Sequence, residues 1–137
     1  MIILNDNENS LVDIVEKIES FSVFINGQNK RVIANSDEFH KIKNNLLLIF
    51  SNSRLMPAFG VSLHKETLNE LKSGAWLQIN FSQPQTKNGL PFNALLFKLE
   101  ETKGFNLIRL FDGKYEGRCL FLDLDQQTNL KDIVEIL

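Results

Sequence analysis

The C-terminal half of the chain carries four short runs of apolar and aromatic residues, separated by Gly, Pro and Asn. The runs cover residues 76–81, 92–99, 105–111 and 115–124. Runs of this length between turn-forming residues predict strands, and their short connections predict an antiparallel meander over residues 76–124. The pair Asp112-Gly113 is typical of a tight hairpin, because both residue types tolerate positive φ angles.

The alternation of polar and apolar positions differs between the first two runs and the last two. In residues 76–81 the polar Gln78 and Asn80 alternate with apolar residues, and residues 92–99 alternate in a similar way. Such alternation predicts strands with one face exposed to solvent. The segment 105–124 is apolar on both faces, so we expect its hairpin to lie at the centre of the sheet.

Apolar residues at helical spacing predict four helices, near residues 10–20, 36–51, 64–73 and 128–136. In the third helix we expect Leu68 and Leu71 to face the core, with Gly74 ending the helix. The second helix has Ser36 placed to cap its N-terminus. Its apolar stripe is the longest in the chain and comprises Phe39, Ile42, Leu46, Ile49 and Phe50.

A hairpin is predicted over residues 21–34, because Asn26-Gly27 separates two apolar segments. Pro57 interrupts any helix in residues 52–61, and residues 59–61 favour either a short extended segment or an irregular connection. We therefore expect an α+β fold in a single domain, residues 1–137. It should hold an antiparallel sheet of four to six strands with the helices packed on it.

Composition places the chain among ordinary globular proteins. It has 137 residues, of which 43% are hydrophobic and 23% are charged. The longest apolar run, residues 46–50, is far shorter than the roughly 20 residues that a membrane span needs. The N-terminus lacks the basic and apolar regions of a signal peptide. These features predict a soluble cytoplasmic protein without a membrane partner.

The formal net charge of −2 is unevenly distributed along the chain. Residues 1–20 and 123–137 are acidic, whereas the middle of the chain is basic. If the two ends lie together, they form an acidic surface that suits a basic protein partner; the alternative is two ordinary solvated helix faces. The negative net charge makes nucleic acid an unfavoured partner. The candidate acidic residues are Glu16, Glu19, Asp132 and Glu135.

Few residues in the chain have the spacing that metal or covalent chemistry requires. Cys119 is the only cysteine, which excludes an internal disulfide, and its place in a predicted strand is typical of a small core residue. His40 and His64 each lack a second ligand at metal-binding spacing. We expect His40 to be exposed on its helix. His64 is placed either as a helix cap or as an acid–base group, and no cofactor or metal is predicted.

The most specific polar cluster surrounds the last predicted hairpin. Arg109 interrupts an apolar strand face, and an arginine in that position needs a partner. One interpretation is an internal salt bridge to Glu116 or Asp112, and the other is an anion- or partner-binding site. The candidate binding residues are His64, Arg109, Tyr115, Glu116 and Arg118.

Two functional hypotheses follow from these patterns. The first is a small non-enzymatic protein that binds and masks a protein partner, as immunity proteins and antitoxins do. The alternative is a small enzyme or anion-binding domain that uses the Arg109, Tyr115, Glu116 and Arg118 region with His64. The first is favoured, because no residue pattern identifies a catalytic centre. A homo-oligomer is compatible with both.

Overall fold

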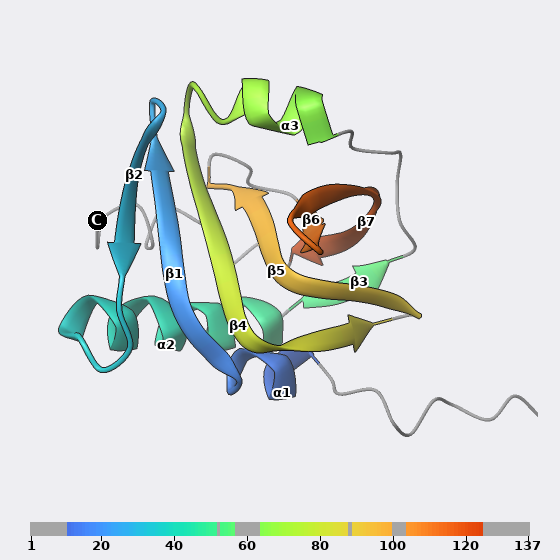
Figure 1. Ribbon diagram of the computed structural model, residues 1–137. Helices are drawn as coiled ribbons and strands as arrows, with labels where there is room; N and C mark the ends of the chain where they lie inside the picture. The colour runs from blue at the N-terminus through green and yellow to red at the C-terminus, as the bar shows by residue number, and fades with distance from the viewer. Residues whose placement is uncertain (1–10, 52, 57–63, 88, 100–103, 125–137) are drawn as a thin grey trace, which may run out of the picture.

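The computed structural model describes residues 11–51, 53–56, 64–87, 89–99 and 104–124. Within these residues seven strands form one antiparallel sheet accompanied by three helices, which confirms the α+β class (Figure 1). In chain order the elements are α1 (Leu11–Val15), β1 (Ile18–Ile25), β2 (Gln28–Val32), α2 (Asp37–Ser51), β3 (Ser53–Met56), α3 (His64–Glu70), β4 (Ala75–Lys87), β5 (Leu90–Lys98), β6 (Gly104–Phe111) and β7 (Lys114–Leu124). The strand order across the sheet is β2-β1-β4-β5-β6-β7-β3.

The local patterns with the clearest spacing form the elements that they predict. The β1–β2 hairpin turns through Asn26 and Gly27, whose φ angles of 50° and 87° are those of a type I′ turn. α2 begins after Ser36, whose Oγ accepts a hydrogen bond from the Phe39 backbone N–H at 3.1 Å. All five residues of the predicted apolar stripe of α2 are buried. The meander β4-β5-β6-β7 is also confirmed.

Two predicted helix boundaries were wrong. The first helix was expected over residues 10–20, but β1 begins at Ile18, which pairs with Phe81 of β4. Pairing with the sheet therefore overrides the helical spacing of this segment. The third helix was expected to reach residue 73, but α3 ends at Glu70 and a tight turn leads to Gly74, whose φ is 79°. The predicted helix at 128–136 lies outside the described residues.

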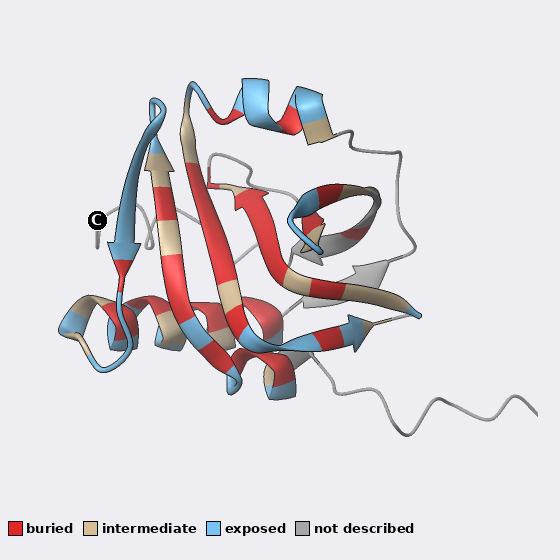
Figure 2. Ribbon diagram, viewed as in Figure 1, coloured by how far each residue is buried: buried red, intermediate tan, exposed pale blue. Residues whose placement is uncertain are grey.

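The seventh strand comes from a stretch in which no strand was assigned. β3 pairs with residues 121–124 of β7 and forms one edge of the sheet. It has only four residues, and a segment that short carries too little alternation to be recognised. β2 forms the other edge, and four of its five residues are exposed (Figure 2).

The two faces of the sheet differ in what covers them. One face, here called the helical face, packs against the buried stripes of α1 and α2 in a continuous apolar cluster. Its strand residues include Phe21, Leu77, Leu95 and Leu107. The opposite face, here called the polar face, carries Ser20, Ser22, Gln78, Asn80 and Tyr115, beside a smaller apolar cluster under α3.

The centre of the sheet lies at β4 and β5 rather than at the β6–β7 hairpin, as had been expected from residues 105–124. Gln78 and Trp76, on the polar face, are both buried, at 8% and 5% exposure. The cause is the curl of the sheet. Gln78 and Tyr115 lie three strands apart, about 14 Å in a flat sheet, yet their side chains are in contact at 2.6 Å. Figure 1 shows the β6–β7 hairpin turned out of the plane of β4 and seen nearly end-on.

Candidate functional site

The β6–β7 turn determines how Tyr115 is presented. Asp112 and Gly113 have φ angles of 55° and 80°, as in a type I′ turn. The residues that flank such a turn, here Phe111 and Lys114, form a hydrogen-bonded pair. Tyr115 comes one residue later, so its backbone N–H points away from β6, toward the outer edge of β7.

His64, the first residue of α3, accepts a hydrogen bond from this edge N–H. The distance from Tyr115 N to His64 Nδ1 is 3.0 Å, and the two rings stack with their centroids 5.6 Å apart. β3 does not occupy this position, because its ladder with β7 covers only residues 121–124. His64 Nδ1 therefore takes the place of a strand carbonyl at the edge of the sheet.

The Tyr115 side chain extends over the polar face toward β4. Its hydroxyl donates to Gln78 Oε1 at 2.6 Å, and both residues are buried. Burial raises the pKa of Tyr115 from 10.0 to about 12, because the tyrosinate anion loses its hydration. The hydroxyl consequently stays protonated at neutral pH and serves as a hydrogen-bond donor.

From Gln78 a chain of side-chain hydrogen bonds crosses the polar face. Gln78 Nε2 donates to Asn80 Oδ1 at 2.9 Å, and Asn80 Nδ2 donates to the hydroxyls of Ser22 at 3.0 Å and Ser20 at 3.3 Å. Each amide accepts at its oxygen and donates from its nitrogen, so the chain runs in one direction from β7 through β4 to β1. Within the described part of the chain, no buried side-chain nitrogen or oxygen lacks a hydrogen-bond partner.

This chain is suited to orienting side chains and poorly suited to moving protons. The amides of Gln78 and Asn80 neither gain nor lose a proton near neutral pH, so they cannot relay one. With a pKa of about 12, Tyr115 is a neutral phenol at pH 7, and a neutral phenol neither gives up nor takes up a proton readily. The arrangement joins β1, β4, β7 and α3 by directional bonds.

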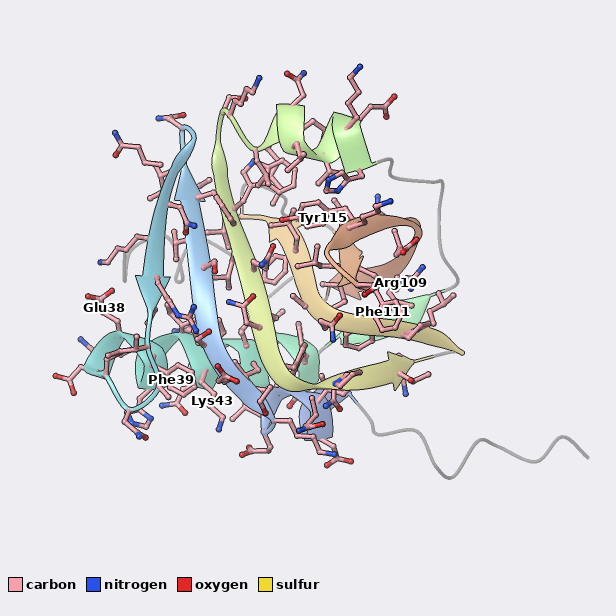
Figure 3. All side chains as sticks on the ribbon, viewed as in Figure 1. Glu38, Phe39, Lys43, Arg109, Phe111 and Tyr115 are labelled. Atoms are coloured by element: carbon pink, nitrogen blue, oxygen red, sulfur yellow. The ribbon has the colours of Figure 1, made fainter. Side chains whose placement is uncertain are left out.

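Arg109 lies on the other side of the sheet from Tyr115. It pairs in register with Leu95, a residue of the helical face, whereas Tyr115 pairs with Leu110 and belongs to the cluster under α3. The Arg109 side chain is buried, and its Nη1 donates to the Pro91 carbonyl oxygen at 2.6 Å. Figure 3 shows Tyr115 beneath α3 and Arg109 farther down, beside Phe111.

The predicted cluster is therefore divided. His64 and Tyr115 come together, Arg109 does not join them, and Glu116 follows Tyr115 as a half-buried residue of β7. Arg118 is in β7, but its side chain lies outside the described part, as does that of Cys119. His40 is exposed on α2, as predicted.

The acidic candidates at the N-terminal end each lie near a basic side chain. Glu16 Oε2 is 3.4 Å from Lys43 Nζ, and Glu19 Oε1 is 3.7 Å from Arg31 Nη2. These exposed pairs neutralise much of the negative charge that the sequence places there. Asp132 and Glu135 lie outside the described residues, so the predicted acidic surface stays a prediction.

Sequence reasoning missed Gln78, Asn80, Ser20 and Ser22. The alternation of Gln78 and Asn80 with apolar residues predicted an exposed strand face, but Gln78 is buried and Asn80 is half-buried. Ser20 and Ser22 were not singled out. One signal was present: both β1 and β4 carry two uncharged polar residues at i and i+2 within otherwise apolar runs. Exposed strand faces usually carry charged residues as well. The lack of charge in the pairs Ser20/Ser22 and Gln78/Asn80 therefore indicates polar side chains that bond to one another.

The outer face of α3 carries an open hollow. Thr67 and Leu71 are the buried residues beneath α3, so Leu68, which was expected to face the core, is 47% exposed instead. The hollow is open, with a volume of about 550 Å³. It is lined by Lys65, Glu66, Leu68, Asn69 and Lys72.

A second contact holds the far end of α3. The Asn26 backbone N–H donates to Gly74 O at 2.9 Å, and the Gly74 N–H donates to Asn26 Oδ1 at 3.1 Å. A Cβ added at Gly27 would lie 3.4 Å from the Lys72 carbonyl oxygen, so the β1–β2 turn approaches the backbone there closely. The start of α3 is held by His64 and the turn that follows it by Asn26.

Comparisons with models of protein families, with curated proteins and with solved structures found no match. In the described residues, no helix has the length and apolar character needed to cross a membrane. The same residues hold no group of three or more His, Cys, Asp or Glu side chains placed to bind a metal ion.

Proposed function

We propose that this chain is a non-enzymatic protein that binds and masks a protein partner, in the manner of an immunity protein or antitoxin, through the outer face of α3. The observation that carries the proposal is the open hollow on α3, in which Leu68 lies half-exposed between two lysines. An exposed leucine in a depression accommodates an apolar side chain of a partner, and burying that pair is favourable.

The charge of the hollow indicates the chemistry of the partner. Lys65 and Leu68 lie at i and i+3 on α3, and Lys72 lies in the turn that follows the helix. With Glu66 as the remaining charged residue, the lining carries a net positive charge. A complementary partner presents an apolar side chain flanked by carboxylates. Such a partner is acidic, whereas the acidic chain ends would favour a basic partner.

The contacts at the two ends of α3 support the same proposal. A seven-residue helix is too short to be stable by itself, so its position depends on tertiary contacts. Those contacts are the His64–Tyr115 bond, the Asn26–Gly74 pair and the burial of Thr67 and Leu71. A surface already held in its binding conformation loses less entropy when a partner binds.

The alternative hypothesis assigns His64, Tyr115 and Arg109 to one site, but each of them forms a hydrogen bond within the fold. His64 Nδ1, the Tyr115 hydroxyl and an Arg109 nitrogen each take part in an intramolecular hydrogen bond, and Arg109 lies on the opposite face from the other two. These contacts favour a structural role for all three residues over an anion site formed by them together.

The test compares two exposed leucines by affinity capture. The immobilised full chain is compared with Leu68→Asp on α3 and with Leu48→Asp on α2, where Leu48 is 58% exposed. Quantitative mass spectrometry of proteins captured from lysate should find one stoichiometric protein with the unmodified chain and with Leu48→Asp, but not with Leu68→Asp. Identical capture by all three proteins, or no stoichiometric protein with any of them, would contradict the proposal.

A further inference from the structure

We propose that the contact between His64 and the Tyr115 backbone amide is a pH-sensitive joint that holds the first turn of α3 against β7. Neutral His64 closes the joint, and protonation of His64 opens it. The joint follows from the geometry of the two residues, whereas its consequence for partner binding rests on the proposed function of the outer face of α3.

The joint depends on one acceptor atom. The Tyr115 N–H points to the outer edge of β7, where β3 supplies no carbonyl, and its described partner is His64 Nδ1 at 3.0 Å. An imidazole nitrogen accepts only through its lone pair, so the ring must be neutral with its proton on Nε2. Protonation places a second N–H on Nδ1, directly opposite the N–H of Tyr115.

The loss of this bond is not replaced within the joint. The Tyr115 hydroxyl is bonded to Gln78 at the far end of a rigid ring, so it cannot accept from the Tyr115 amide. The stacked ring of Tyr115 still attracts an imidazolium, which keeps His64 nearby but supplies no acceptor to the amide. Opening therefore releases the edge N–H to solvent and loosens the first turn of α3.

The charged groups next to the joint in the sequence are two basic and three acidic side chains. On α3 His64 is followed by Lys65 and Glu66; on β7 Tyr115 is flanked by Lys114 and Glu116; the turn before them carries Asp112. Tyr115 itself stays neutral over this range, because burial raises its pKa to about 12. The imidazole of His64 is itself the acceptor in the joint, so its protonation state decides whether the bond forms.

For a protein that binds through the outer face of α3, an open joint removes one of the contacts that hold this face in place. The Asn26–Gly74 pair contains no titratable group and remains closed at either pH. Binding should therefore weaken in mild acid without loss of the fold. A partner would be retained at neutral pH and released as the pH falls.

The experiment is an NMR titration of the full chain without any partner. The chain has two histidines, so His40, exposed on α2, is an internal control. We expect the Tyr115 amide resonance to follow the titration of His64 and not that of His40. Its protection from hydrogen exchange, corrected for intrinsic rates, should fall about ten-fold on protonation, the equivalent of one hydrogen bond. His64 ring nitrogens should show the Nε2–H tautomer at high pH.

Two variants separate the joint from general acid effects. His64→Asn places a side-chain oxygen at the position of Nδ1, and this oxygen accepts a hydrogen bond but does not titrate, so Tyr115 should stay protected at both pH values. His40→Phe should leave the response unchanged. A Tyr115 amide resonance that does not follow the His64 titration, or a pH response that persists in His64→Asn, would overturn the joint. Because no partner is present, that outcome is independent of whether the outer face of α3 binds a protein.

Discussion

The helical face and the polar face of the same sheet are held by different forces. On the helical face, apolar side chains of β1, β4, β5 and β6 meet the stripes of α1 and α2, and burial provides the stability. On the polar face, the described residues combine a small apolar cluster under α3 with hydrogen bonds linking three strands and α3. The first arrangement tolerates any well-packed apolar set, whereas the second requires particular donors and acceptors in particular places.

The difference explains how the sheet acquires its curl. Apolar packing on the helical face is compatible with a range of strand curvatures, because burial is not directional. The bond between Tyr115 and Gln78 is satisfied only when β7 lies over β4. Register irregularities at residues 81–84 in β4 and beside Arg109 in β6 give the strands the local twist that this requires.

The largest expected loss in the free energy of unfolding comes from a substitution on the helical face. Leu77 of β4 is completely buried there, so Leu77→Ala should lower the free energy of unfolding by about 3 kcal/mol, through lost burial and a new cavity. Chemical denaturation measures the change. Leu48→Ala, at an exposed position on α2, should change the stability by less than about 0.5 kcal/mol. Equal losses for the two variants would show that the helical face is not the principal core.

The next largest loss of stability is expected at Gln78, which follows Leu77 in β4 and lies on the opposite face of the sheet. Gln78→Leu keeps the approximate size of the side chain but leaves the Tyr115 hydroxyl without an acceptor and Asn80 Oδ1 without a donor. We expect a loss of about 2 kcal/mol in the free energy of unfolding. Gln83→Leu, at an exposed position of β4, is the control. A stabilised Gln78→Leu protein would mean that the polar face needs only apolar packing.

A spectroscopic prediction addresses the burial of the polar face. Tyr115 is the only tyrosine in the chain, so tyrosinate absorbance reports on it alone. In the folded protein it should titrate near pH 12, and in denaturant near its ordinary value of 10.0. Because the folded pKa is raised, this contribution to stability is present below pH 10 and is lost as the pH rises through about 12. A folded-state midpoint at 10 would place the hydroxyl in solvent.

The smallest effects are expected from the ion pairs at the margin of the helical face. Glu16→Gln and Glu19→Gln remove exposed pairs with Lys43 and Arg31. Each should change the free energy of unfolding by less than about 0.5 kcal/mol, and the change should shrink further in 1 M salt. A loss of 2 kcal/mol from either variant would mean that charge pairing contributes as much as the chain of amides.

The helical face could be predicted from the sequence, because its signals are local. The Ser36 cap, the five-residue stripe of α2 and the two Asx-Gly turns each depend on residues close together in the chain. The extent of the first helix and the presence of β3 could not be predicted, because both depend on pairing with distant strands.

The site was predictable only in part, for the same physical reason. His64 and Tyr115 were both identified as candidates, but their contact joins residues 51 positions apart and depends on the curl of the sheet. Arg109 was grouped with Tyr115 because both lie near one turn, yet the alternation of β6 and β7 places them on opposite faces. Leu68 was assigned to the core by its type, whereas the rotation of α3 turns Thr67 inward.

The most direct test of the two-face account is a double-mutant cycle across the curled sheet. The free energy of unfolding is measured for the unmodified chain, Gln78→Leu, Tyr115→Phe and the double variant. The double variant should be less destabilised than the sum of the single variants, by about 1 kcal/mol, because the hydroxyl of Tyr115 and the amide of Gln78 bond to each other. Additivity within about 0.3 kcal/mol would contradict it, since the polar face would then hold β7 over β4 without this bond.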